Sequence, residues 1–264
     1  MIDSLRLAFG LLTILPAGMP SHVDRIVGSR AMILAPLVGA VLGAIAAGVV
    51  ALAQLVRPDA DLLAAVLGVL AVAALSGGLH LDGLADFADA LGSRRDRETM
   101  LRIMKQSDIG PFGVVSIVGV LLVDVAALTA CLHANLGWQA ILIATTASRL
   151  TLPWTCRTTI PPARPEGLGA LVAATVHPRT ALLTTLAVLV PALALTALTA
   201  PKTTGWLSAS PAPTALTILL AVLTALATTR RAQSALGGTT GDVLGAAIEL
   251  TLPVTLTALA LTPL

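Results

Sequence analysis

The chain is 264 residues long, with 56% hydrophobic and 11% charged residues and a mean hydropathy of +0.92. These values exclude a water-soluble protein, and apolar runs of about 20 residues along the whole length leave no room for a separate soluble domain. The net charge of +2 gives no reason to expect a nucleic-acid partner. We therefore predict one integral membrane domain over residues 1–264, an all-α polytopic bundle embedded in the lipid bilayer.

About seven spans and one short helix are expected in chain order. Residues 5–16 are apolar but too short to cross a bilayer, which indicates an interfacial or re-entrant helix ended by Pro16. The expected spans are residues 31–56, 62–79, 112–133, 138–156, 180–200, 214–229 and 243–264. In the first span, Gly39, Gly43 and Gly48 offer positions for close helix packing.

The basic residues predict the orientation of the chain. If Arg6, Arg25 and Arg30 are cytoplasmic, 14 of the 16 Lys and Arg residues lie on that side or close beneath it. Only Arg57 and Lys202 then lie outside. Because cytoplasmic loops of membrane proteins carry the excess of Lys and Arg, the loop that follows residue 79 is expected to be cytoplasmic.

Residues 80–92, which read HLDGLADFADALG, follow the second expected span. On a helix, Asp82, Asp86 and Asp89 fall within one narrow stripe because they are spaced by four and three residues. The opposite side is apolar and consists of Leu84, Phe87, Ala88 and Leu91. Mg²⁺ would relieve the repulsion among the carboxylates, since it takes oxygen ligands and shares its shell with substrate phosphates. The alternative is a solvated acidic face.

The next loop, residues 93–110, is the most charged part of the chain. Within it, Arg97, Lys105 and Ser107 are candidates for binding phosphate oxygens. A basic cytoplasmic loop also attracts anionic lipids, so this alternative stays open.

Two cysteines and two intramembrane charges follow. Cys131 and Cys156 are expected at opposite ends of a helical hairpin, too far apart for a disulfide, so both are interpreted as small buried residues. Asp124 and Arg149 have similar depths, which suggests a buried ion pair. Alternatively, Arg149 reaches toward a phosphate site.

Residues 237–242 read GGTTGD and open the last expected span. In such a turn, backbone N–H groups and the helix dipole can hold a phosphate, here at Thr239, Thr240, Gly241 and Asp242. Asp242 is equally explained as a helix cap, and a lone glycine-rich turn is weak evidence. Glu249 has no such explanation and is expected to line a polar cavity, because an acid in an apolar span is costly. His80 is interpreted as a packed, hydrogen-bonded residue.

Three stretches resemble motifs of the cobalamin synthase family, the adenosylcobinamide-GDP ribazoletransferases. They are residues 80–89 (HLDGLADFAD), 100–107 (MLRIMKQS) and 237–249 (GGTTGDVLGAAIE). Ser148-Arg149 and residues 166–169 (EGLG) also resemble the family, so the likeness covers nearly the whole chain.

The resemblance implies a Mg²⁺-dependent transfer at the cytoplasmic face of the bacterial inner membrane. The adenosylcobinamide-phosphate group would pass from adenosylcobinamide-GDP to α-ribazole or its 5′-phosphate, and GMP would leave. We expect Asp82, Asp86 and Asp89 to hold Mg²⁺ and either Asp89 or Glu249 to act as general base. Arg149 would compensate charge in the transition state, together with Arg97 and Lys105.

Two other functions remain open from the sequence. A CDP-alcohol phosphatidyltransferase also displaces a nucleoside monophosphate with Asp-rich helices, but the Ala-Arg expected after its Asp-Gly pair is missing here. A cation transporter would place its acids near the bilayer middle, whereas most acids here lie at one face. A homo-oligomer is compatible with the sequence.

Overall fold

The computed structural model describes residues 1–134, 136–199 and 212–261. Within these ranges the protein consists of helices with two isolated bridges and no named strand, which confirms the all-α class. The helices are α1 (Ile2–Leu12), α2 (Arg25–Val56), α3 (Asp61–Leu75), α4 (Leu79–Gly92), α5 (Arg97–Ile103), α6 (Pro111–His133), α7 (Gly137–Arg149), α8 (Thr151–Thr155), α9 (Leu168–Val172), α10 (Pro178–Thr199), α11 (Ala212–Leu236) and α12 (Gly241–Leu261). Lys202 and the predicted span ends at residues 200 and 264 lie outside the described residues.

Five described helices are long and apolar enough to cross a bilayer, namely α2, α6, α10, α11 and α12. The pair α3 and α4 makes a sixth if its two bent parts count as one span. The multi-pass architecture is therefore confirmed, with five or six candidate spans where the sequence suggested about seven. The segment predicted as residues 138–156 is divided between α7, which has 13 residues, and α8, which has five.

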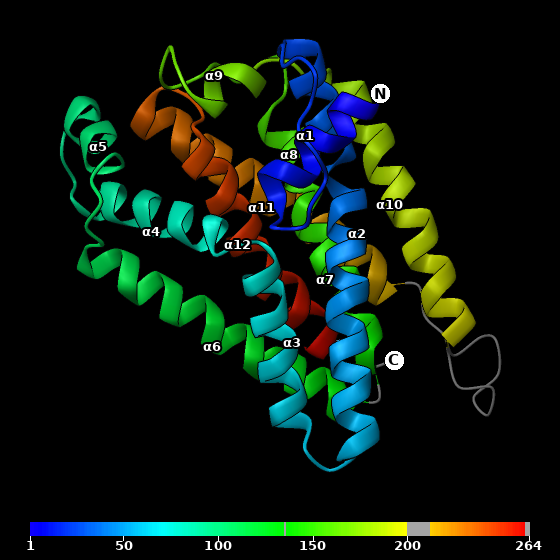
Figure 1. Ribbon diagram of the computed structural model, residues 1–264. Coiled ribbons are helices and arrows are strands. Elements are labelled where there is room, and N and C mark those ends of the chain that lie inside the picture. Colours follow the sequence, from blue (N-terminus) through cyan, green and yellow to red (C-terminus); the bar gives the residue numbers. More distant parts are fainter. Residues whose placement is uncertain (135, 200–211, 262–264) are drawn as a thin grey trace.

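A sharp bend separates α3 from α4. The two helix axes differ by 86°, and the connection contains Gly77 and Gly78 with φ of 65° and 70°. Glycine adopts this left-handed conformation at little cost, because it has no Cβ. The expected span 62–79 therefore ends early, at Leu75, and α4 runs almost perpendicular to α3 (Figure 1).

Helices α2, α7 and α12 form the centre of the bundle, where small residues bring backbones together. A Cβ on Gly39 would lie 2.7 Å from the carbonyl oxygen of Thr145, and one on Gly43 would lie 3.0 Å from Cα of Leu142. These two predicted packing positions are confirmed. Gly48 has no neighbour within 4 Å and does not serve this purpose. Both cysteines are free and buried, as expected.

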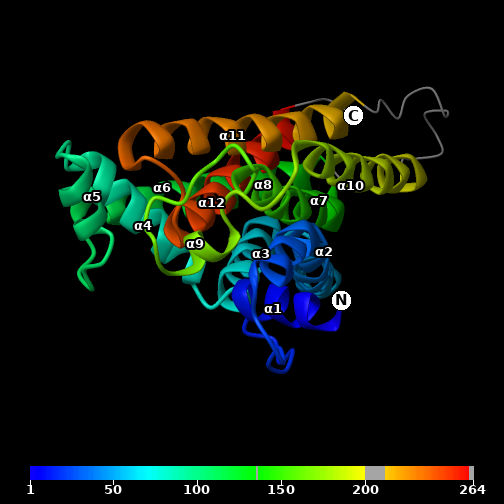
Figure 2. The ribbon, with the colours of Figure 1, turned by 90° about the horizontal axis from the view of Figure 1, so that it is seen from above.

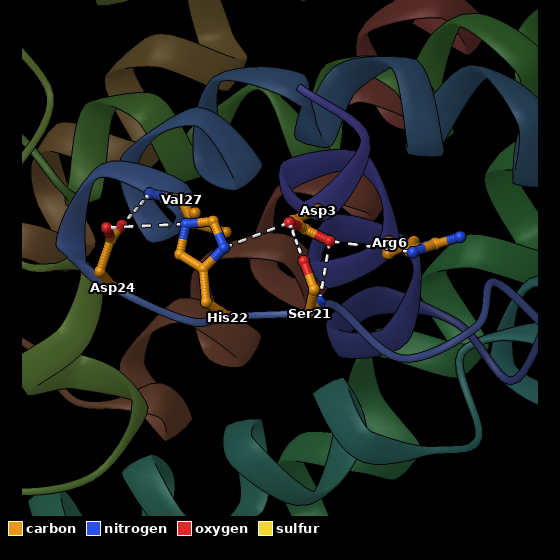
Figure 3. Close-up of polar contacts among 6 residues, drawn as sticks. All are labelled: Asp3, Arg6, Ser21, His22, Asp24 and Val27. Carbon is orange, nitrogen blue, oxygen red and sulfur yellow. Dashed lines mark hydrogen bonds and ion pairs between the residues drawn. The ribbon is translucent and has the colours of Figure 1, made fainter.

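Polar contacts join the short first helix to the loop that precedes α2 (Figure 3). Asp3 accepts hydrogen bonds from the backbone N–H and the hydroxyl of Ser21, at 2.9 and 2.6 Å, and lies 3.3 Å from Nδ1 of His22. The hydrogen bonds from Ser21 lower the pKa of the Asp3 carboxyl. Since α1 ends at Leu12, it is too short to cross a bilayer, as expected.

The connections gather at two ends of the bundle. Helices α1, α5 and α9 lie toward one end, and the turn between α2 and α3 lies at the other (Figure 1). Seen from above, α9 and the start of α12 lie beside α4, between α5 and α1 (Figure 2). The predicted site motifs of α4 and α12 are thus at the same end.

Candidate active site

Helix α4 carries the three predicted acids on one side. On the other side, Leu84 and Phe87 are buried, with 2% and 4% of their surfaces exposed. Asp82 is exposed, and Asp86 and Asp89 are half-buried. The amphipathic pattern predicted for residues 80–92 is therefore present in α4.

Close packing of two glycines brings α4 against the first turns of α12. A Cβ on Gly83 would lie 2.9 Å from the carbonyl oxygen of Asp242, and a Cβ on Gly245 would lie 3.2 Å from Cα of His80. Larger residues would force the two backbones apart. As a result, the motifs at residues 80–89 and 237–249, far apart in the sequence, share one site.

Three carboxylates form the acidic cluster, which we define as Asp82, Asp86 and Asp242. Asp86 is close enough to repel both of the others electrostatically, and Asp242 also interacts with Asp82. Like charges held together in this way are stabilised by a cation. The cluster therefore combines two predicted metal ligands with an acid that the sequence analysis had assigned to phosphate binding or capping.

Asp89 has a different environment from the other acids of α4. Its carboxylate accepts hydrogen bonds from the backbone N–H of Gly110 at 2.7 Å and of Gly113 at 2.9 Å. Gly110 is the N-cap residue of α6 and Gly113 lies in its first turn, where N–H groups lack partners within the helix. Asp89 thus caps α6 with both oxygens, a role that its spacing within α4 does not reveal.

Arg164 lies beside the acidic cluster, a position that the sequence did not predict. Nη1 of Arg164 lies 4.0 Å from Oδ2 of Asp242, and its guanidinium also interacts electrostatically with Asp86. Arg164 is anchored from the other side, because Nη2 donates to the carbonyl of Leu101 at 2.6 Å. A single arginine after two prolines in a polar loop carries no local signal of such a position.

The loop that carries Arg164 is held against the glycine-rich turn. The N–H of Ala163 donates to the carbonyl of Thr239 at 2.8 Å, and the N–H of Thr239 donates to the carbonyl of Pro161 at 3.0 Å. A Cβ on Gly238 would lie 2.2 Å from this Pro161 oxygen, so only glycine fits there. The turn thereby fixes the distance between Arg164 and the acidic cluster.

The threonines of the turn are buried and serve the local backbone. The hydroxyl of Thr240 accepts from the N–H of Val243 at 3.3 Å and donates to Asp242 at 3.2 Å. The helix cap is therefore Thr240, and the capping role suggested for Asp242 is wrong. Thr239 is fully buried, so any phosphate at Gly241 would meet the N–H groups of the first turn of α12 rather than these hydroxyls.

Arg97 is one of the three predicted phosphate-binding residues of the loop 93–110, and it approaches the glycine-rich turn at residues 237–242. Its guanidinium lies over Gly237, where a Cβ would be 2.8 Å from Cζ, and it donates to the carbonyl of Ala163 at 3.1 Å. Lys105 and Ser107 are exposed. Ser107 donates to Asp108 at 3.1 Å, and within the described residues neither Lys105 nor Ser107 contacts the acidic cluster.

A second group of charges is buried beneath the acidic cluster. Arg149 is fully buried, and its Nη1 donates to Ser148 at 2.9 Å. It interacts electrostatically with Asp124 and Glu249, but no nitrogen–oxygen contact within 4.0 Å joins it to either. The direct ion pair proposed between Asp124 and Arg149 is therefore not formed.

Glu249 instead faces His80. Its Oε1 lies 3.8 Å from Nδ1 of His80, and both side chains are buried. Neither nitrogen of His80 has a hydrogen-bond partner in the described protein. The histidine is thus packed, as expected, but not hydrogen-bonded, which contradicts the second half of that interpretation.

The acidic cluster fits a cation that is shared with a substrate. Among the described residues, no three His, Cys, Asp or Glu side chains are arranged to hold a metal ion by themselves. Mg²⁺ does not require such a cage, because one or two carboxylates with substrate phosphates and water complete its shell. Asp82, Asp86 and Asp242 fit that requirement better than the predicted set with Asp89, whose oxygens cap α6.

Comparison with protein families decides the relationship. Residues 4–260 match the family model described as cobalamin-5-phosphate synthase. The chain belongs to the cobalamin-5-phosphate synthase family.

Full-length relatives agree with this assignment. An adenosylcobinamide-GDP ribazoletransferase of Frankia casuarinae is 43% identical, covering 97% of this chain and 94% of the relative. Proteins with the same name from a Nocardioides species and from Pseudomonas paraeruginosa are 37% and 39% identical, with at least 98% of each chain covered. No solved structure matches.

Membership in the cobalamin-5-phosphate synthase family makes this chain a transferase of cobalamin biosynthesis. The resemblance stated from residues 80–89, 100–107 and 237–249 is thereby confirmed. Membership favours this activity over the phosphatidyltransferase and cation-transporter alternatives.

Proposed function

We propose that this protein transfers the adenosylcobinamide-phosphate group of adenosylcobinamide-GDP to α-ribazole or its 5′-phosphate in a Mg²⁺-dependent reaction. The products are adenosylcobalamin or its 5′-phosphate and GMP. The reaction takes place at the cytoplasmic face of a bacterial inner membrane. The observation that carries this proposal is the acidic cluster, in which α4 and α12 are held together through Gly83.

The acids of the cluster bind the donor through its pyrophosphate. Asp82, Asp86 and Asp242 would hold Mg²⁺ against the phosphate oxygens, since a pyrophosphate alone would be repelled by them. When bound, Mg²⁺ neutralises phosphate charge and stabilises the leaving GMP. The remaining contribution of the protein is positioning and electrostatic stabilisation, which dominate phosphoryl-type transfers.

Arginines beside the cluster supply positive charge to the reacting phosphate. Arg164 lies 4.0 Å from Asp242, and Arg97 lies over the glycine-rich turn, so both border the expected pyrophosphate position. Guanidinium groups bind phosphate oxygens in a bidentate manner. We assign charge compensation to these two residues, and we give Arg149, which is fully buried, a positioning role through Glu249 and Asp124.

The general base is assigned by exclusion among the acids. Asp89 already accepts two backbone hydrogen bonds, and Glu249 is buried beside His80. The exposed carboxylate of Asp82 is free of hydrogen bonds to described residues, so its oxygen that does not hold Mg²⁺ would take the proton of the attacking ribose hydroxyl.

The direct test is reconstitution of the reaction. Purified protein in lipid nanodiscs receives adenosylcobinamide-GDP, α-ribazole and Mg²⁺, and the corrinoid product and GMP are quantified by chromatography. EDTA and Asp82→Ala should each abolish both products, whereas the matched variant Asp108→Ala, in the exposed loop before α6, should retain activity. Product formation that persists with EDTA and in Asp82→Ala would refute the metal assignment.

A further inference from the structure

Four ionisable side chains are buried in the bundle beneath the acidic cluster, each on a different helix. Arg149 interacts electrostatically with the other three, and Asp124 also interacts with Glu249. Ionisable side chains inside a membrane-spanning bundle are costly, so each of them requires a partner or a function. We call these residues the buried charge group, and none is more than 4% exposed: His80 of α4, Asp124 of α6, Arg149 of α7 and Glu249 of α12.

The charges of this group do not balance in their ordinary ionisation states. Two carboxylates and one guanidinium leave one negative charge in excess when the imidazole is neutral. Among the described residues, only Arg149 and Glu249 act electrostatically on Asp124, so no outside cation removes the excess. Helix α3 also packs against α6, but its one acid, Asp61, lies 3.1 Å from His133 at the last turn of α6. The excess charge must therefore be removed within the group.

Asp124 lacks the contacts that would stabilise a carboxylate. It is fully buried, and neither of its oxygens has a hydrogen-bond partner among the described residues. An ionised carboxylate can only accept hydrogen bonds, and without donors in an apolar medium it takes up a proton instead. Glu249 differs, because it keeps a small exposed surface and has Nδ1 of His80 at 3.8 Å from its Oε1.

We propose that Asp124 carries a proton and is uncharged, which leaves Glu249 as the counter-charge of Arg149 and makes the buried charge group neutral. Glu249 is then a positioning residue, because it connects this charge balance to α4 through His80, two residues before Asp82. The positioning role deepens the proposed function and rests on it. The charge state of Asp124 is independent of that function, since it follows from burial and missing donors.

Two contacts between α4 and α12 explain how this group reaches the acidic cluster. At the cluster, Gly83 packs on the backbone of Asp242. About one turn earlier, His80 meets Glu249, and its Cα would lie 3.2 Å from a Cβ on Gly245. Both contacts are needed to fix the direction of α4 and thus the separation of the acids. Removing the charge of Glu249 would leave a buried guanidinium uncompensated, which is strongly unfavourable and would displace the helices around it.

Amide substitutions test the two acids of the group against each other. In the full-length enzyme in nanodiscs, Asp124→Asn replaces a neutral acid by a neutral amide of similar shape and should keep the melting temperature. Glu249→Gln should lower the melting temperature and reduce kcat by up to about 100-fold with little change in either KM, since misplaced groups slow turnover. The double variant Arg149→Met/Glu249→Gln removes both charges, so it should regain the melting temperature but not the turnover.

Infrared spectroscopy detects the proton on Asp124 without any substrate. Protein that is isotope-labelled at its aspartate carboxyls is compared at alkaline pH, where exposed carboxyls are ionised. The wild type should show the carbonyl band of a protonated carboxylic acid, and Asp124→Asn should lack it. A wild type without this band, a band that persists in Asp124→Asn, or an Asp124→Asn protein as unstable as Glu249→Gln would overturn the charge state.

The positioning role has its own contrary result. Full recovery of both melting temperature and turnover in Arg149→Met/Glu249→Gln would show that the pair serves folding alone and would overturn the positioning role. Absence of any transfer by the wild type would instead refute the proposed function, and the infrared band would still decide the charge state of Asp124.

Discussion

The carboxylate of Asp89 caps the first turn of α6 through both oxygens, at 2.7 and 2.9 Å from the N–H groups of Gly110 and Gly113. The same residue belongs to the acidic stripe that the sequence assigns to metal binding. The two roles have different consequences. A carboxylate that caps a helix stabilises the fold, whereas a carboxylate that binds a metal ion contributes to catalytic activity.

Removal of the cap should therefore destabilise the protein. We predict that Asp89→Ala lowers stability by about 0.5–2 kcal/mol, the usual cost of a lost helix cap. Thermal unfolding in detergent, followed by tryptophan fluorescence, measures this effect. Asp82→Ala, which removes an exposed side chain, is the control and should leave the melting temperature unchanged. Equal melting temperatures for Asp89→Ala and the wild type would contradict the capping role.

Part of the site could be predicted residue by residue, and part could not. The stripe of Asp82 and Asp86 follows from helical spacing alone. The positions of Arg164 and Thr240 depend on how a loop is held against a distant turn, through the hydrogen bonds of Thr239 with Ala163 and Pro161. Such long-range pairs leave no periodic pattern in the sequence.

At the level of helices, the site depends on the close approach of α4 to α12. A Cβ on Gly83 would lie 2.9 Å from the carbonyl oxygen and 3.0 Å from Cα of Asp242, both parts of a rigid backbone. The backbone cannot yield locally, so a larger residue must separate the two helices and with them the acids of the cluster.

Gly83→Ala should consequently impair both stability and activity. We predict a loss of about 1–3 kcal/mol, the cost of overpacking, together with a decrease in kcat. Gly119→Ala is the matched control, because a Cβ on Gly119 of α6 has no neighbour within 4 Å. Melting temperature and turnover are measured for both. If Gly83→Ala had the same melting temperature and turnover as Gly119→Ala, the contact between α4 and α12 would not be needed to form the site.

Helix positions were largely predictable, but helix ends were not. Hydropathy located the apolar segments that became α2, α6, α10, α11 and α12. It extended the second span through Ser76, Gly77 and Gly78, because an apolar average is insensitive to the left-handed conformation that bends the chain there. For the same reason hydropathy predicts one span over 138–156, although the helix is interrupted after Arg149.

For the whole molecule, the distribution of Lys and Arg predicts that the end carrying α1, α5 and α9 faces the cytoplasm. The turn between α2 and α3 lies at the opposite end (Figure 1). Because Cys131 and Cys156 are buried, single exposed cysteines can report the orientation without background labelling.

We predict that Asp59→Cys, in the turn between α2 and α3, reacts with a membrane-impermeant maleimide in intact spheroplasts. Gln106→Cys, in the loop between α5 and α6, should react only after permeabilisation. Labelled protein is quantified on gels. The reverse pattern would place the acidic cluster outside the cytoplasm and would contradict the proposed site of the reaction.

The central claim is that Asp82, Asp86 and Asp242 together bind a divalent cation that is shared with the donor pyrophosphate. Electron paramagnetic resonance of Mn²⁺, titrated into the full-length enzyme with adenosylcobinamide-GDP, measures this binding directly. We predict tight Mn²⁺ binding that requires the donor and is lost in the double variant Asp82→Asn/Asp86→Asn, while Asp108→Asn binds Mn²⁺ like the wild type. Mn²⁺ binding of unchanged affinity in the double variant would contradict it.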